Sequence, residues 1–105
     1  MKYDNPILNE RQSTHGDFSN TADAAQKIKG VLRHTAQAAG VRLTPVQWEV
    51  VDMIATKLAR IVSGNPNELD HWKDIAGYAD LSSAQLIPSE VKSIFTERAD
   101  VKQST

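Results

Sequence analysis

Four acidic residues have the spacing of a divalent-metal site. Glu49 and Asp52 are three residues apart, and Asp70 and Asp74 are four residues apart. Residues at these spacings lie on one face of a helix, so each pair projects from neighbouring positions. Carboxylate oxygens bind Mg²⁺, which keeps several waters and is commonly completed by substrate phosphates. If the two segments form facing helices, the sequence predicts that these four residues together bind Mg²⁺ or Mn²⁺.

Two basic residues accompany the first acidic pair. Lys57 and Arg60 follow Asp52 on the same segment. Arginine binds phosphate oxygens as a planar fork and lysine binds them as a point charge. These residue types together favour a metal–phosphate site and hence a nucleotide ligand. The alternative interpretation is that all six side chains form a solvated helix face.

The segment 44–63 carries the clearest helix signals. Thr44 is a typical N-cap, Pro45 suits the first helical position, and Gln47 completes a capping box. Gly64 is expected to end this helix. The charged residues of the segment then lie opposite an apolar stripe.

A short turn leads to a second helix, predicted over 68–80, which carries the second acidic pair. Because the connection is short, the two helices are expected to be antiparallel neighbours. Ser82 and Ser83 are expected to separate a last helical turn after Pro88. Gly77, inside the helix, is expected to mark a close helix–helix crossing.

The fold class is predicted to be all-α. An Ala-rich segment over 21–39 has apolar residues at three- and four-residue steps, which predicts an N-terminal helix that closes at Gly40. No stretch alternates apolar and polar residues, so no sheet is expected. The sequence predicts a small helical bundle built on the antiparallel hairpin plus this helix. We expect an arm or loop over 1–20, one domain over 21–87, and a helical turn with a frayed tail over 88–105.

The charge balance, the cysteine content and the length of the chain exclude several classes of protein. The chain has 105 residues, 12 Lys plus Arg against 13 Asp plus Glu, and no cysteine. A near-zero net charge argues against direct nucleic-acid binding, and the lack of cysteine excludes thiolate metal sites. No apolar run is long enough for a membrane span and no secretory signal is recognised, so a cytoplasmic protein is expected. A chain this short buries only a modest core, which favours a homo-oligomer.

The acidic spacing resembles the signature of the all-α NTP pyrophosphatases, the MazG and dimeric dUTPase-like superfamily. In that signature a Glu-x-x-Glu pair is followed, after a variable gap, by a Glu-x-x-x-Asp pair on the next helix. Here Glu49-x-x-Asp52 is followed by 17 residues and then Asp70-x-x-x-Asp74. Asp52 and Asp70 stand where the family usually has Glu.

This resemblance implies a Mg²⁺-dependent enzyme that cleaves NTPs or dNTPs between the α and β phosphates with a metal-activated water. It implies that the four acids hold the metal, with Glu49 and Asp74 as catalytic residues. Lys57 and Arg60 would bind the phosphates. Tyr78 or Phe18 would supply a wall for the base.

Longer motifs are similar to a family of small phage and prophage proteins of unknown function. They are Gly16-Asp17-Phe18, Lys57-x-x-Arg60-Ile61 and Asp70-x-Trp72-x-Asp74-Ile75-Ala76-Gly77-Tyr78, and the likeness covers residues 11–86. That family usually has Tyr before Gly-Asp-Phe, where this chain has His15. The resemblance implies a phage- or prophage-encoded protein of the bacterial cytoplasm.

Three functions stay open at this point. The first is the nucleotide pyrophosphohydrolase, and the second is a phage protein that binds and sequesters a nucleotide, such as a host-defence signal, without cleaving it. The third is a structural or inhibitory interaction module whose acids are surface residues. His71 is interpreted as a residue behind the acids rather than a ligand. The segment from His15 to Phe18 is either a loop that closes over a ligand or an entry turn.

Overall fold

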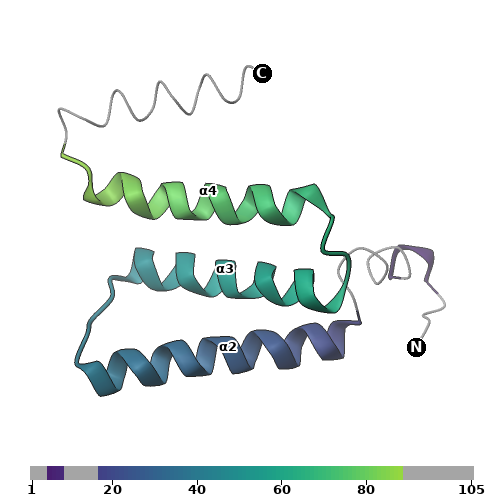
Figure 1. Ribbon diagram of the computed structural model, residues 1–105, viewed down its shortest axis with the longest axis horizontal. Coiled ribbons are helices and arrows are strands. Elements are labelled where there is room, and N and C mark those ends of the chain that lie inside the picture. Colours follow the sequence, from purple (N-terminus) through teal and green to yellow (C-terminus); the bar gives the residue numbers. More distant parts are fainter. Residues whose placement is uncertain (1–4, 9–16, 89–105) are drawn as a thin grey trace.

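Three long helices lie side by side, with the second in the middle (Figure 1). The computed structural model describes residues 5–8 and 17–88, and these contain helices and loops but no strand, which confirms the all-α prediction. The helices are α2 (Phe18–Ala39), α3 (Pro45–Ser63) and α4 (Leu69–Leu86), and a short helical stretch covers residues 6–8. Among the described residues, none of the helices combines the length and apolarity of a membrane span. His15, Gly16 and the predicted last turn over 89–105 lie outside the described residues.

The first long helix begins earlier than the sequence predicts. The side chain of Asp17 accepts a hydrogen bond from the backbone N–H of Ser19 at 2.8 Å, so Asp17 is the N-cap and α2 starts at Phe18 rather than at residue 21. At the other end, Gly40 adopts φ 67°, the left-handed conformation in which its N–H meets the last carbonyls of the helix. The predicted closing glycine is thus confirmed. The predicted arm is wrong in its last residues, since the N-cap signal of Asp17 decides the start.

The capping box of α3 is present as predicted. The hydroxyl of Thr44 accepts from the N–H of Gln47 at 3.1 Å, and the side-chain oxygen of Gln47 accepts from the N–H of Thr44 at 3.0 Å. The helix ends at Ser63, as expected. Gly64 follows it with φ −133°, so this glycine does not form a left-handed cap.

The last long helix continues past the expected boundary at residue 80. It runs through Ser82 and Ser83 to Leu86, so the predicted break at the two serines is wrong. A serine inside a helix costs only about 0.5 kcal/mol of helix stability relative to alanine. Packing of α4 against α3 outweighs this cost. The helix ends where Pro88 forces the residue before it out of helical geometry, because Ile87 has φ −81° and ψ 131°.

α3 packs between its two neighbours. The hydroxyls of Thr21 and Ser63 are 2.7 Å apart, and Nζ of Lys57 lies 2.8 Å from Oδ2 of Asp74. These contacts fix the register of both antiparallel pairs. Buried residues flank α3 on opposite sides: Ala55 and Ala59 toward α2, and Val50 and Ile61 toward α4. The described residues therefore form a single layer of helices, and most of the core of this layer is made of small side chains.

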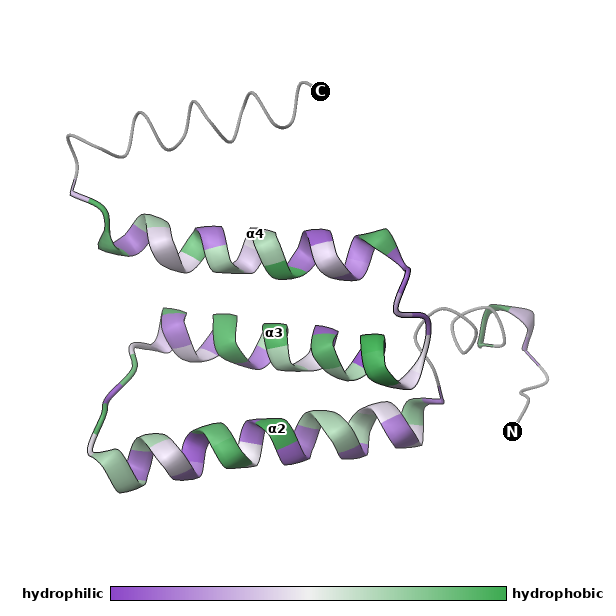
Figure 2. Cartoon of the chain, in the orientation of Figure 1, coloured by the Kyte–Doolittle hydropathy of each residue, from purple (hydrophilic) through white to green (hydrophobic). Residues whose placement is uncertain are grey.

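A single layer leaves two broad faces. At about 100° of rotation per residue, two exposed apolar side chains from each of the three helices fall on the same side of the layer, whereas Leu81 lies on the other side. We call this side the apolar face, and Figure 2 shows apolar residues recurring along each helix. Its members are Val31 and Leu32 of α2, Leu58 and Val62 of α3, and Trp72 and Leu86 of α4.

The opposite side is the polar face. It carries all six charged residues singled out from the sequence, together with one arginine of α2. These are Arg33 of α2; Glu49, Asp52, Lys57 and Arg60 of α3; and Asp70 and Asp74 of α4. The candidate site therefore lies on a surface that the helix periodicity sets apart from the apolar face.

Candidate functional site

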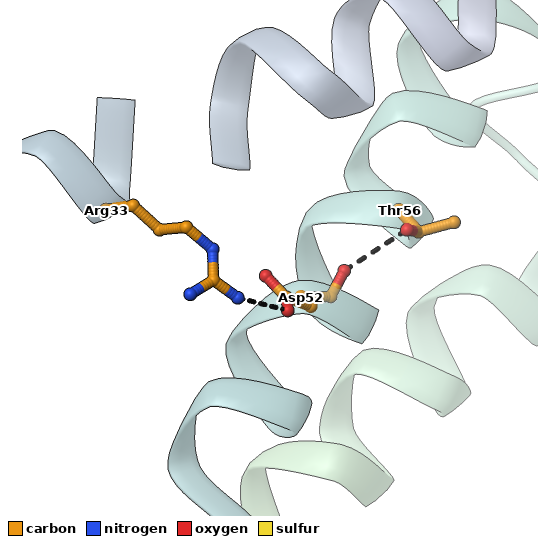
Figure 3. A network of polar contacts seen from close by, with 3 residues as sticks. All are labelled: Arg33, Asp52 and Thr56. Carbon is orange, nitrogen blue, oxygen red and sulfur yellow. Dashed lines mark hydrogen bonds and ion pairs between the residues drawn. The ribbon is translucent and has the colours of Figure 1, made fainter. Parts of the chain in front are cut away.

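The centre of the polar face is an ion pair between α2 and α3. Nη2 of Arg33 donates to Oδ2 of Asp52 at 2.8 Å, and Figure 3 shows the guanidinium reaching across the helix interface. The same guanidinium lies over the ring of Trp48, with Cζ 4.2 Å from the ring centroid. This cation–π contact adds to the ion pair and orients the arginine. The hydroxyl of Thr56 donates to the backbone carbonyl of Asp52 and leaves the carboxylate to Arg33.

The second carboxylate oxygen of Asp52 is unusual. Oδ1 is buried and has no hydrogen-bond partner within the described residues. A buried acceptor without a partner costs free energy, about 1–3 kcal/mol, and a water or an ion is among the partners that can satisfy such an atom. Glu49 lies one turn away on the same face and is exposed. A cation at this point would meet two carboxylates of one helix.

A second ion pair connects α3 to α4. Lys57 is largely buried and its Nζ donates to Oδ2 of Asp74 at 2.8 Å. The pKa of Asp74 lies below its ordinary value because of this hydrogen bond. Partial burial opposes the shift, while the charge of Lys57 and the nearby His71 and Arg60 reinforce it. Asp74 is thus held as a carboxylate by a lysine that the sequence assigned to a phosphate.

The two acidic pairs do not converge. Lys57 is level with Asp74, Glu49 lies eight residues before Lys57, and Asp70 lies at the loop end of α4. At 1.5 Å per residue, Glu49 and Asp70 are about 18 Å apart along the helix axes. No group of three or more His, Cys, Asp or Glu side chains within residues 17–88 has the geometry of a metal site. The expected four-carboxylate cluster is therefore absent from the described residues of a single chain. Each acidic pair lies in the N-terminal half of its helix, and antiparallel helices place their N-terminal ends at opposite ends of the hairpin.

The predicted base-binding residues lie far from each other. Phe18 opens α2 and is 74% exposed, whereas Tyr78 is half-buried on the central part of α4, toward α3. The structure does not bring them together. Gly77 beside Tyr78 does not mark a close crossing either, since an added Cβ there would meet nothing within 4 Å.

Two residues of the site region were missed or underestimated from the sequence. Arg33 is not among the residues singled out from the sequence, although the short α2–α3 loop fixes a register that puts it opposite Asp52. His71 is 1% exposed and is the largest fully buried side chain of the described residues. It is among the groups that lower the pKa of Asp74, and its predicted place beside the acids without binding a ligand stays a prediction. The loop length was the signal that could have identified Arg33.

Comparisons with known proteins assign the chain to a family. No curated protein and no solved structure matches it. A family model described as "Domain of unknown function (DUF6378)" matches residues 2–85, a range that includes the whole polar face and the predicted arm from residue 2 onward. The chain therefore belongs to the DUF6378 family.

Proposed function

We propose that this protein binds a magnesium–nucleotide complex on its polar face and acts on it as a pyrophosphohydrolase. The observation that carries the proposal is the unpartnered Oδ1 of Asp52, one helical turn from the exposed carboxylate of Glu49. Mg²⁺ is usually held by one or two carboxylates plus substrate phosphates rather than by a full protein cage. The residues present therefore fit a hydrated Mg²⁺ at Glu49 and Asp52, in place of the four-carboxylate site expected from the sequence.

The basic residues of the same face would serve the phosphates. Arg60 lies on the same side of α3 as Glu49, and within the described residues no ion pair occupies its guanidinium. Arg33 neutralises Oδ2 of Asp52 and so limits the repulsion that a second carboxylate would meet. When bound, Mg²⁺ would polarise the phosphates and lower the pKa of a bound water. The spacing of the acidic residues, which resembles the signature of the NTP pyrophosphatases, supports the same assignment.

The test is a product assay with matched variants. Purified protein is incubated with pooled NTPs and dNTPs and Mg²⁺, and monophosphate and pyrophosphate are measured. Glu49→Gln and Asp52→Asn are expected to lower turnover at least about 100-fold, a loss of roughly 2.7 kcal/mol in transition-state stabilisation. Asp80→Asn on α4, which removes the same charge away from the polar face, is the control and should retain activity.

The same experiment separates hydrolysis from binding. Nucleotide recovered intact from the denatured protein, with Mg²⁺-dependent retention lost in Asp52→Asn, would identify a sequestering protein instead of an enzyme. If millimolar Mg²⁺ neither raises the melting temperature nor promotes nucleotide retention, the polar face has no such role. The acids would then serve as the interhelical ion pairs described above.

A further inference from the structure

The apolar face is too large and too exposed for an isolated helical layer. Val31, Val62 and Leu86 are between 64% and 74% exposed, and three more large apolar side chains lie on the same side of the layer. Stable domains bury such stripes between two layers of secondary structure. The described part of the chain supplies only one layer, so this face requires a second one.

The face is also free of charge across its centre. The positions between these residues on the three helices carry alanine, threonine and further apolar side chains, including Ile28, Val51, Ile54, Ile75 and Ala79. The charged residues Lys27 and Asp80 lie at the outer edges of the face and not at its centre. A surface without charge at its centre is complementary to itself, because two copies can face each other without burying an unpaired charge.

A hollow adds shape to this surface. A groove of about 300 Å³ lies between the C-terminal half of α2 and the start of α3. Leu32, Leu43, Trp48 and Val51 are among its lining residues, and Leu32 belongs to the apolar face. Side chains that project from a facing layer would have a recess to fill, as in interdigitated helix packing.

The extent of the face matches a dimer interface. With a rise of 1.5 Å per residue and axes about 9 Å apart, three helices of 22, 19 and 18 residues cover about 800 Å². Standard interfaces bury about 800 Å² on each partner. We infer that the apolar face binds the same face of a second copy of this chain, so that two layers form one closed helical bundle. This interface lies on the opposite side from the proposed nucleotide site and does not depend on it.

The first test measures mass in solution. Size-exclusion chromatography with light scattering should give twice the 11.6 kDa of one chain, or an even multiple of it, for the full-length protein. Val62→Glu should shift the protein toward the monomer. Leu81→Glu is the matched control, because Leu81 is 60% exposed but on the other side of α4. If the wild-type protein is a monomer, the proposal is overturned. This holds whether other residues of the same chain or another protein covers the face.

A second measurement avoids variants that fail to fold. Since the chain has no cysteine, Val62→Cys and Leu81→Cys each introduce a single thiol. Maleimide modification at position 62 should slow by about tenfold or more as protein concentration rises above the dissociation constant, while modification at position 81 should not change. Equal rates at both positions over the whole concentration range would contradict a face-to-face dimer.

Discussion

At the scale of single residues, the polar face consists of two ion pairs on either side of α3. Arg33 pairs with Asp52, and Lys57 pairs with Asp74. Both acids were expected to bind metal, yet each already has a cationic partner from a neighbouring helix. What distinguishes them is the second oxygen of Asp52, which is buried without a partner, whereas the Asp74 side chain is 46% exposed to solvent. This difference is why the proposed metal site uses Asp52 rather than Asp74.

The pair of Lys57 and Asp74 predicts a pH dependence of stability. The pKa of Asp74 is lowered in the folded state by the hydrogen bond from Lys57, so its carboxylate stabilises the fold above the unfolded-state pKa of about 3.9. That contribution is lost as the pH falls through the lowered pKa of the folded state. Because Asp74 is partly exposed, Asp74→Asn is expected to cost only about 0.2–1 kcal/mol of unfolding free energy at pH 7.

Melting curves between pH 2 and pH 7 check this prediction. The wild-type and Asp74→Asn melting temperatures should differ at neutral pH and converge in acid. Asp80→Asn serves as the control, since Asp80 makes no ion pair among the described residues. A wild-type–variant difference that stays constant down to the lowest pH would show that the charge of Asp74 does not contribute to stability.

At the scale of the helices, local signals determine the ends and tertiary contacts determine the register. Asp17, Thr44 and Gly40 set three of the helix boundaries through hydrogen bonds within a few residues. The end of α4 follows from Pro88, a constraint that outweighs the two serines before it. The register of one helix against the next is set instead by the short loops that connect them.

Replacing two glycines by alanine is expected to change the stability in opposite directions, one glycine inside α4 and one directly after α2. Gly77 lies inside α4 with open space around it, so Gly77→Ala should raise the free energy of unfolding by about 0.5–1 kcal/mol. Gly40 has φ 67°, where a side chain is strained, so Gly40→Ala should lower it by about 1 kcal/mol or more. Urea denaturation measures both values. Destabilisation by Gly77→Ala would indicate that α4 packs closely against another chain at this glycine.

At the scale of the whole molecule, the described helices form a single layer with a charged face and an exposed apolar face. Seven described residues are buried, and most are small. Such a layer gains the rest of its core from a facing layer. Two of the ion pairs lie on the polar face, and the proposed dimer would use the uncharged side.

Assembly predicts that thermal stability depends on protein concentration. If unfolding is coupled to dissociation of a dimer, a hundredfold increase in concentration stabilises the folded state by about 2.7 kcal/mol, which raises the melting temperature by about 6 °C for two chains of this length. Calorimetry at low and high concentration measures the shift. Val62→Glu should melt at the same temperature at both concentrations, and an unchanged melting temperature in the wild type would argue against coupled assembly.

The sequence by itself determined the fold class, the capping box of α3, the closing glycine of α2 and the periodicity that separates charged from apolar residues. These features depend on neighbours within about one helical turn, which is why they can be read from the chain. Only the tertiary structure decided which acids meet and which cations they meet. The antiparallel arrangement and the loop lengths set the register of each helix against the next. For this reason Arg33 reaches Asp52, whereas Glu49 is separated from Asp70. The orphaned oxygen of Asp52 and the uncovered apolar face follow from the same packing.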